Sequence, residues 1–251
     1  MKAMETVRAA RDIQRAKGSD WIRGLMDYFI ELHGDREYAD DKAIIGGLAL
    51  LGDMPVTVIA QQKGKNPKEM RRRNFGMVKP EGYRKVMRLI AQAEKFGRPV
   101  ITLIDTPGAA CGREAEERNQ AGAIAECIGA FAGLTVPSIS IIIGEGGSGG
   151  ALALGVTDEV WMLENSVYSI LSPEGFASIL WKDSSRCEEA AELMGLTAAE
   201  LYARGFVDTV ITEEEGMFAT VKEALYQRLK LLRSEDRAVR TQRKYTKYRS
   251  M

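Results

Sequence analysis

The protein has 251 residues, of which 45% are hydrophobic and 28% charged, with 35 Lys and Arg against 35 Asp and Glu. This length suits a single domain with a sizeable core, and a net charge of zero argues against a general nucleic-acid or membrane binder, which would need a basic excess. The cysteines, Cys111, Cys127 and Cys187, are odd in number and widely spaced, so we expect neither a disulfide framework nor a metal site.

The N-terminus and the single histidine narrow the function further. Residues 1–17 are charged throughout and lack the apolar core of a signal peptide, and no stretch approaches the roughly 18 apolar residues of a membrane span. These features predict a cytoplasmic protein that does not enter a membrane. No GxSxG motif accompanies His33, so we expect a loop role for this residue and no serine–histidine catalysis.

The apolar pattern predicts alternating helices and strands. Residues 5–32 are predicted helical with a break at Gly18-Ser19, and residues 43–60 form a β-hairpin that turns at Gly52-Asp53. Further helices are predicted at 83–96, 115–134, 151–156, 173–181, 186–194, 198–204 and 219–232, and strands at 100–104, 136–143, 159–162, 166–170 and 207–211. The alternation indicates a parallel α/β architecture, and the hairpin with the paired short strands near 160–170 indicates repeated β-β-α units.

The chain divides into three predicted segments. Residues 1–32 form an N-terminal helical segment, residues 33–232 a single α/β domain, and residues 233–251 a C-terminal extension. The extension contains no acidic residue after Asp236 but several Lys and Arg. We therefore expect it to be mobile or bound to a partner.

Two short motifs resemble nucleotide sites but lack the usual context. Residues 144–149 satisfy GxGxxG, yet they follow at least three predicted strands, whereas a dinucleotide fingerprint sits at the first strand–helix turn of its unit. Asp105–Gly108 has the form DxxG, but no GxxxxGK[ST] loop precedes it. Dinucleotide binding and phosphoryl transfer are therefore minor alternatives.

A basic run between residues 63 and 73 contains one acid, Glu69. A solvated loop is the plain interpretation. A clamp for a phosphorylated ligand is the alternative, because guanidinium groups match phosphate geometry. Nucleic-acid binding is less favoured, since the run lacks interleaved aromatic residues. The candidate phosphate ligands are Lys65, Arg71, Arg72 and Arg73.

Two glycine-rich turns, 105–112 and 144–150, each follow a buried strand and precede a helix. In a parallel sheet both turns fall at the carboxyl edge, where ligands bind. Glycine allows a substrate to approach the backbone, and the first N–H groups of a helix are free and carry positive partial charge. One N–H group from each turn, directed at the same oxygen, would form an oxyanion hole. Close helix packing is the alternative role for the glycines.

Several sequence blocks resemble the alpha subunits of the bacterial acetyl-CoA carboxylase carboxyltransferase. The resemblance covers roughly residues 25–235. It departs from the family pattern at Asn119, where such proteins usually carry glycine. The matching blocks are 33–36 (HGDR), 62–64 (QKG), 73–77 (RNFGM), 80–85 (PEGYRK), 104–109 (IDTPGA), 115–118 (AEER), 143–151 (IGEGGSGGA), 164–166 (ENS), 168–169 (YS), 172–175 (SPEG) and 178–183 (SILWKD).

The resemblance implies a crotonase/ClpP-like spiral of β-β-α units and transfer of a carboxyl group from carboxybiotin to acetyl-CoA, giving malonyl-CoA for fatty-acid synthesis. It implies a biotin carboxyl carrier protein that bears the biotin, and a separate biotin carboxylase that uses ATP. It also implies a homologous, zinc-containing beta subunit that completes the active site in an α2β2 assembly. Negative charge develops on the ureido oxygen of biotin and on the thioester oxygen, so backbone donors suffice and no side-chain base is needed.

The candidate site residues follow from the two turns and the resemblance together. Gly149, Gly150 and Ala151 are the first candidates for oxyanion-hole donors, and Gly108, Ala109 and Gly112 the second. Gly146, Gly147 and Ser148 are expected on the carboxybiotin side. The basic residues 65 and 71–73 are candidates for the CoA phosphates.

Two other functions remain open. One is a different crotonase-fold acyl-CoA enzyme, a decarboxylase or hydratase, which would use acids such as Glu145 and Glu174. The other is a non-catalytic scaffold or nucleic-acid-binding subunit that would use the basic run and the basic tail.

Overall fold

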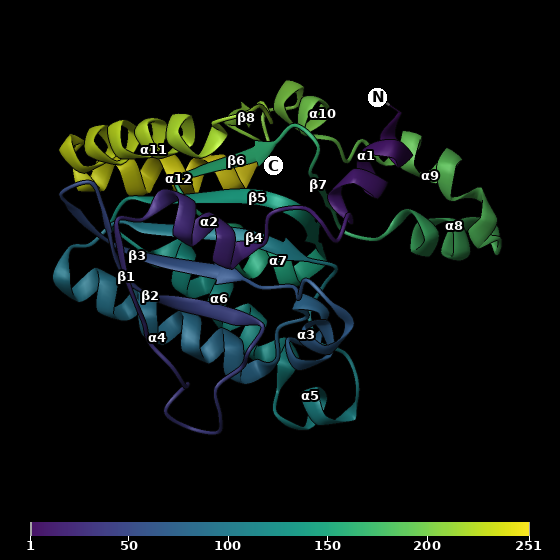
Figure 1. The fold of residues 1–251 in the computed structure, drawn as a ribbon, viewed down its shortest axis with the longest axis horizontal. Helices are drawn as coiled ribbons and strands as arrows, with labels where there is room; N and C mark the ends of the chain where they lie inside the picture. The colour runs from purple at the N-terminus through teal and green to yellow at the C-terminus, as the bar shows by residue number, and fades with distance from the viewer. Residues whose placement is uncertain (1, 251) are drawn as a thin grey trace.

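A computed structural model of the protein describes residues 2–250, so the outermost residues of the two predicted terminal segments, 1 and 251, lie outside it. A central sheet has helices on both faces, and a helical arm projects from one side (Figure 1). The strands are β1 (Tyr28–Glu31), β2 (Ile44–Leu51), β3 (Met54–Gln61), β4 (Val100–Thr106), β5 (Ser138–Gly147), β6 (Glu159–Leu163), β7 (Val167–Ser169) and β8 (Thr209–Ile211).

The helices include two short 3-10 segments, η1 (Asn74–Gly76) and η2 (Ser184–Arg186). The α-helices are α1 (Ala3–Ala10), α2 (Gly18–Leu25), α3 (Pro67–Arg72), α4 (Pro80–Phe96), α5 (Arg113–Glu117), α6 (Gln120–Gly133), α7 (Ser148–Gly155), α8 (Pro173–Trp181), α9 (Cys187–Met194), α10 (Ala198–Ala203), α11 (Met217–Ser234) and α12 (Arg237–Ser250). Among these helices, none is long and apolar enough to cross a membrane.

The sheet runs in the order β1-β2-β3-β4-β5-β6-β8. The predicted hairpin is present as the antiparallel pair β2 and β3, and the pairs from β3 to β8 are parallel. The short strands near 160–170 do not pair with each other as predicted. Instead, β6 pairs with the first half of β5 and β7 with its last residues, Glu145–Gly147. The sheet therefore divides along β5, and the first residues of the second glycine turn, 144–147, are the end of this strand.

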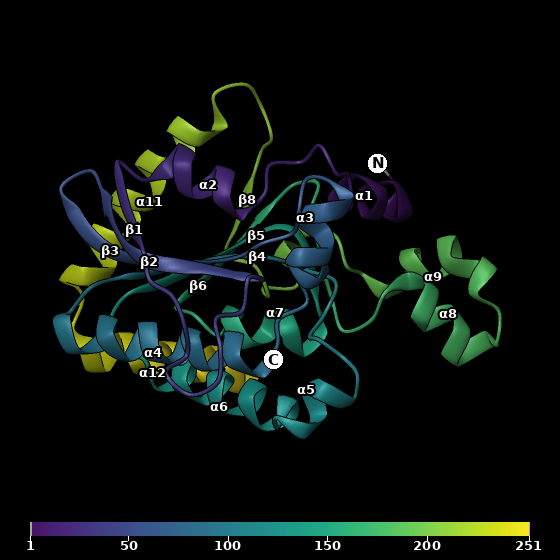
Figure 2. The same ribbon diagram turned by 60° about the horizontal axis from the view of Figure 1, so that its bottom comes forward.

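Alternate side chains of the central strands pack on opposite faces of the sheet, as the twofold period of a strand requires. In β4, Ile101 and Leu103 join the core formed with α2 and α11, whereas Val100 and Ile104 join the core formed with α4 and α6. The helices on the two faces are visible in Figures 1 and 2. Both faces are buried, which explains why every residue of β4 is buried.

The predicted helix 5–32 is wrong at its end. The chain forms α1 and α2, and residues 28–31 are strand β1, paired antiparallel with β2. Helix α1 lies on the other side of the molecule from β1, against α9 and β7, through a small apolar cluster that includes Met4 and Val7. This cluster joins the projecting arm, α8 and α9, to the body (Figure 2).

The predicted helix 115–134 is interrupted. Asn119 takes a left-handed φ of 63° and separates α5 from α6. Asparagine tolerates this conformation better than most residues other than glycine. The departure from the family's glycine is therefore compatible with the backbone observed here.

The C-terminal extension packs on the body of the molecule as a helix, a structure that the sequence did not predict. Residues 237–250 form helix α12, which returns along the body beside α11 and against α6 (Figure 1). Lys244 is buried and donates to the carbonyls of Phe131 and Leu134 at 2.9 and 2.6 Å, and Arg240 is buried and donates to the carbonyl of Thr135. The basic side chains thus satisfy carbonyl groups at the C-terminal end of α6.

Candidate functional site

The two glycine turns lie side by side at the carboxyl edge of the sheet. β4 and β5 are parallel neighbours, and after a register shift Thr106 pairs with Gly146. The turn after β4 therefore begins level with the end of β5, where α7 starts. This register confirms that both turns lie at one edge of the sheet, while the convergence of their amides on one oxygen stays a prediction.

Two glycines are required for the turns to touch. A Cβ atom on Gly147 would overlap the carbonyl group of Pro107. A Cβ atom on Gly150 would lie 2.6 Å from the amide nitrogen of Ala109, closer than real Cβ atoms come to backbone. Gly149 differs, since a Cβ atom there would meet only the Cγ2 atom of Ile124 at 3.5 Å. The close approach of backbone to backbone therefore depends on Gly147 and Gly150.

The N-terminus of α7 presents uncapped amide groups at this contact. Gly147 is the N-cap residue and makes no side-chain cap, and Ser148 follows with a left-handed φ of 51°. The amides of residues 148–150 have no partner within the helix and carry its positive end charge, whereas the amide of Ala151 makes the first intrahelical bond, to the carbonyl of the N-cap residue. This end of α7 can therefore bind a negatively charged oxygen.

The first turn contributes one free amide beside α7. The Gly108 amide donates to Oγ1 of Thr106 at 3.1 Å, and the Ala110 amide donates to the carbonyl of Val78 at 2.9 Å. No acceptor for the Ala109 amide is found among residues 2–250. Gly112 begins α5 with a φ of 116°, and a Cβ atom there would meet nothing within 4 Å. Of the candidates in this turn, Ala109 is thus the donor placed beside Gly150.

A buried ionic network lies behind the turns. The ammonium of Lys63 is 2.8 Å from Asp105 and 2.6 Å from Glu145. Oδ1 of Asp105 also accepts the amide of Glu145 at 3.1 Å. Burial disfavours the charge on Lys63, but the two carboxylates outweigh burial and raise the pKa of Lys63. Burial would raise the pKa of Glu145, yet Lys63 and Arg11 together lower it.

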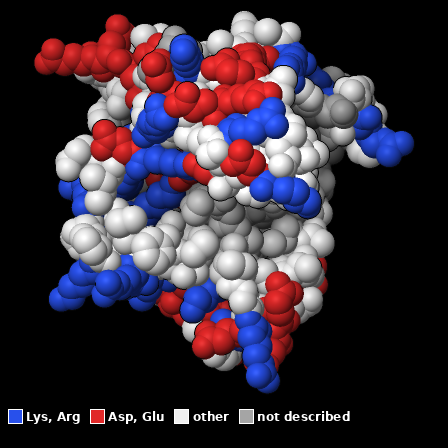
Figure 3. All heavy atoms as spheres, turned by 90° about the vertical axis from the view of Figure 1, so that its right-hand side faces the viewer, with Lys and Arg blue, Asp and Glu red and all other residues white. Residues whose placement is uncertain are grey.

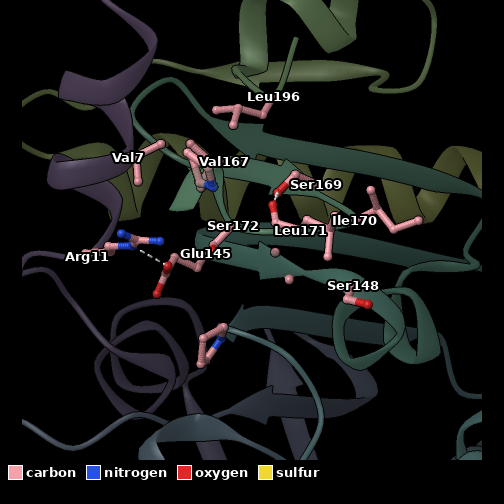
Figure 4. A pocket seen from close by; sticks show the side chains of 14 residues that line it. Val7, Arg11, Glu145, Ser148, Val167, Ser169, Ile170, Leu171, Ser172 and Leu196 are labelled. Atoms are coloured by element: carbon pink, nitrogen blue, oxygen red, sulfur yellow. Dashed lines mark hydrogen bonds and ion pairs between the residues drawn. The ribbon is translucent and has the colours of Figure 1, made fainter. Parts of the chain in front are cut away.

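Arg11 extends this network to the arm. Its guanidinium binds Glu145 at 2.7 Å and Glu174, at the start of α8, at 2.7 and 3.2 Å. The hydrogen bond from Arg11 lowers the pKa of Glu174 to about 2. Figure 4 shows Arg11 and Glu145 on one wall of a small pocket of about 50 Å³, with Ser148 across from them. Both acids are therefore held ionised beside the glycine turn.

A larger, mostly apolar hollow of about 490 Å³ adjoins the start of α7. Its lining includes Gly149 and Leu152 of α7, Tyr168 and Ile170 of the segment around β7, and Phe206. Figure 3 shows the corresponding side of the molecule, hollowed in its middle, where uncharged residues predominate, with Lys, Arg, Asp and Glu above and below. The start of α7, at Ser148 and Gly149, therefore borders an apolar cavity.

The basic run divides into internal and exposed residues. Lys63 belongs to the buried network, Lys65 pairs with Asp20 at 2.6 Å, and Arg73 donates to the carbonyl of Lys42 at 2.9 Å. Arg71 and Arg72 are exposed on α3, with no ion pair among the described residues. Of the four candidate phosphate ligands, Arg71 and Arg72 are therefore the two whose side chains are available to bind a phosphate.

Sequence reasoning missed three residues that the structure places against the turns: Gln61, Lys63 as an internal ion-pair partner, and Arg11. A usable signal was present for two of them. Gln61 and Lys63 are polar residues at the carboxyl end of an otherwise apolar strand, the position where sites form in parallel sheets. For Arg11 no local signal exists, because its partners lie more than 130 residues away.

Comparison with known proteins gives one family. The model of the family described as "Acetyl co-enzyme A carboxylase carboxyltransferase-like" matches residues 1–251. The acetyl-coenzyme A carboxylase carboxyl transferase subunit alpha of Clostridium perfringens is 53% identical over 257 residues, covering 99% of this chain and 95% of the relative. A protein of Natranaerobius thermophilus named subunits beta/alpha is 51% identical over 255 residues, and the match covers 98% of this chain but 42% of that protein.

Solved structures show the same fold at low identity. A transcarboxylase 12S structure with methylmalonyl-coenzyme A bound superposes with a TM-score of 0.76 at 20% identity, covering 92% of this chain but only 44% of that one. A Pseudomonas malonate decarboxylase hetero-tetramer in complex with coenzyme A superposes with a TM-score of 0.73 at 19% identity, covering 88% of this chain and 90% of that one. These neighbours are crotonase-fold proteins, so the predicted fold class is confirmed.

Proposed function

Because the chain belongs to the family of acetyl-coenzyme A carboxylase carboxyltransferase alpha subunits, we propose that its two glycine turns form the oxyanion hole for the ureido oxygen of biotin. The family's activity is carboxyl transfer to acetyl-CoA, which yields malonyl-CoA for fatty-acid biosynthesis. The observation that carries the proposal is the contact of the Ala109 amide with Gly150 at the uncapped start of α7.

The residues at the turns fit biotin, whose uncharged bicyclic head group contains a planar ureido ring with one strongly accepting oxygen. The donors at the start of α7 and at Ala109 match that oxygen, and the apolar hollow beside Gly149 and Leu152 matches the ring system. When bound, biotin supplies the carboxyl group and takes up the methyl proton of acetyl-CoA. Gly146, Gly147 and Ser148 line the small pocket next to this hollow, and Ser148 lines both, so we expect these residues on the carboxybiotin side.

The chain's own contribution is electrostatic. The free amides of Gly149 and Gly150 lie in the first turn of α7 and are fixed by the helix, so they need no reorganisation when charge develops on a bound oxygen. Each such donor is worth about 3–4 kcal/mol in other oxyanion holes. The third candidate, Ala151, is the fourth helical residue, and its amide is used by the first bond within the helix. Ala109 adds a donor from the neighbouring turn, whereas Gly108 and Gly112 contribute backbone geometry through their positive φ angles.

The acids near the turns do not favour the alternative of a decarboxylase or hydratase that acts alone. Such an enzyme would need a carboxyl group that exchanges protons near neutral pH. Glu145 and Glu174 both bind Arg11, and the pKa of each is lowered. A carboxylate held in this way is a weak proton acceptor and is not available as a donor.

A homologous, zinc-containing beta subunit is the proposed partner that completes the site, in an α2β2 assembly. The Natranaerobius relative, in which beta and alpha parts share one name, supports such a pairing. The arm offers a surface for it, since Ile179, Leu180 and Leu193 are each more than half exposed, and Ile170 beside the hollow is 75% exposed. The biotin carboxyl carrier protein and an ATP-using biotin carboxylase are the further partners we propose.

One assay tests the proposal. Malonyl-CoA decarboxylation with free biotin as the carboxyl acceptor is measured with this chain alone, with a beta-type subunit alone, and with both. We expect biotin-dependent turnover only in the mixture. Turnover by this chain alone would contradict the shared site, and a mixture that assembles but remains inactive would contradict the proposed reaction.

A further inference from the structure

Gln61 joins the two glycine turns from behind. It is the last residue of β3, and its side chain is completely buried. Its Oε1 atom accepts the amide of Asp105, the residue where the first turn begins, at 3.2 Å. Its Nε2 atom donates to the carbonyl of Gly150 in α7 at 2.7 Å. One side chain therefore binds the backbone of both turns.

The bond to Gly150 bears directly on the proposed donors. Gly150 lies in the first turn of α7, whose free amides include those of Gly149 and Gly150. Because the helix holds these amides rigidly, a bond to the Gly150 carbonyl fixes where they lie relative to Asp105 and the first turn.

The position requires an amide side chain. It must accept one hydrogen bond and donate another over a fixed distance, which an ionised Glu cannot do because it only accepts. An apolar residue would leave the Asp105 amide and one lone pair of Gly150 without this partner in a fully buried place. Neither β3 nor the sheet needs this chemistry, because the backbone of Gln61 already pairs with Ile44 of β2.

We infer that Gln61 is a positioning residue for carboxyl transfer, which holds the first turn and the start of α7 in the relative orientation that the oxyanion hole needs. The inference rests on the proposed function. Gln61 does not touch the substrate, so its loss acts on the rate of the chemical step and leaves the affinity for the acyl-CoA unchanged.

The neighbouring Gln62 provides a matched control. It is also buried, and its side chain binds the backbone, accepting the amide of Ser19 at 2.7 Å and donating to the carbonyl of Lys63 at 2.8 Å. The first of these bonds holds the start of α2, and neither bond reaches a residue of the two turns. Gln62→Leu should therefore cost stability without a specific loss of rate.

The first experiment compares Gln61→Leu with Gln62→Leu in the assembled complex with a beta-type subunit, using malonyl-CoA and free biotin. We expect kcat of Gln61→Leu to fall by about 10- to 100-fold, with KM for malonyl-CoA within about twofold of wild type. Gln62→Leu should keep kcat within about twofold. Equal losses in the two variants, or a change in KM alone for Gln61→Leu, would overturn the inference.

The second experiment uses Gln61→Glu and pH. A neutral Glu can donate its O–H group to the Gly150 carbonyl and accept the Asp105 amide with its other oxygen, whereas the ionised form cannot donate. The activity of Gln61→Glu relative to wild type should therefore rise as the pH falls from 8 to 6. A constant ratio across this range would count against the inference. Loss of biotin-dependent turnover in the wild-type complex would instead refute the proposed function, so the two failures are distinguishable.

Discussion

The α carbon of Gly150 lies against the amide of Ala109, so closely that a Cβ atom on Gly150 would be 2.6 Å from the Ala109 nitrogen and 2.6 Å from the Gly108 carbonyl carbon. Gly150→Ala must therefore push the two turns apart. We expect at least a 100-fold loss of kcat in the malonyl-CoA assay, comparable to the removal of an oxyanion-hole donor.

Gly149→Ala is the control for this prediction. Its added methyl group meets Ile124 at an ordinary contact distance and leaves the backbone amide in place. Activity should stay within a few fold of wild type. Similar activities for the two variants would show that the contact between the turns does not matter for the reaction.

Lys63→Met should destabilise the protein strongly, because it leaves Asp105 and Glu145 buried without their shared cation. The expected loss is about 3–5 kcal/mol at pH 8, measured by urea unfolding. Lys65→Met is the control, since its ion pair with Asp20 is half-exposed and should be worth about 1 kcal/mol or less.

The stability of Lys63→Met should depend less on acid pH than that of wild type. In wild type the pKa of Glu145 is lowered, so its stabilising contribution is present above the ordinary carboxyl range and is lost as the pH falls through that range. Without Lys63, only Arg11 opposes the effect of burial on Glu145, so this contribution should shrink. Urea unfolding at a series of pH values measures the difference, and an equally steep loss of stability in the two proteins would contradict the assignment.

Asp41 should make the protein less stable as the pH rises through about 6. Burial raises its pKa to about 6, above the ordinary value for Asp. A raised carboxyl pKa contributes stability that is fully present below the unfolded-state value and is lost as the pH rises through the folded-state value. The contribution is roughly 1–3 kcal/mol. Asp41→Asn should remove this decrease in the free energy of unfolding, measured by unfolding curves from pH 4 to pH 8. An unchanged decrease would mean that other groups cause it.

Arg71 and Arg72 are the exposed residues of the basic run, so we expect them to bind the CoA phosphates if this subunit holds any of them. The double change to Ala should raise KM for malonyl-CoA by about tenfold and leave KM for free biotin unchanged. The increase should be smaller with 3′-dephospho-malonyl-CoA if the 3′-phosphate is the group bound. No change in either KM would place the phosphates on the partner.

Lys244→Met should lower stability by roughly 2–4 kcal/mol, because the carbonyls of Phe131 and Leu134 lose a buried charged donor. Thermal unfolding is a suitable measurement. Arg243→Ala is the control, since Arg243 is half-exposed and pairs with Glu235 at the surface. Equal unfolding temperatures for the two variants would mean that α12 does not anchor α6.

The elements with strong local signals could be predicted from the sequence. The hairpin at 44–61 and the two glycine turns are of this kind, because turn residues and apolar runs mark them directly. Residues 28–31 could not be predicted, because Phe29 continues the helical spacing of Met26 and becomes a strand only through pairing with β2. The order of the strands was equally out of reach, since β7 pairs with β5 across more than 20 residues.

The same limit applies to the site. The sequence indicates which turns carry the amides. It does not show that Gly150 is sterically required and Gly149 is not, because that depends on which glycine faces Ala109 in the folded protein. The basic run looks uniform in the sequence, yet Lys63 is internal because two acids, 42 and 82 residues further along, meet it in space. The composition of the basic tail is typical of a mobile extension. Its packing could not be predicted, because Lys244 binds carbonyl groups at the C-terminal end of α6 that are distant in the sequence.

The atoms proposed to bind the oxyanion all belong to the main chain, and every amino acid except proline carries the same N–H group. No substitution other than proline deletes such a donor, so mutation can reach the reaction only by crowding or tilting the backbone. A comprehensive mutational scan should accordingly show positions 147 and 150 rejecting substitutions by size, with alanine already harmful and charge of little further importance. Position 149 should tolerate small side chains of any chemical type. In such data the size of the substituted side chain, and not its charge, would determine activity at this site, unlike in an enzyme that depends on a catalytic acid or base.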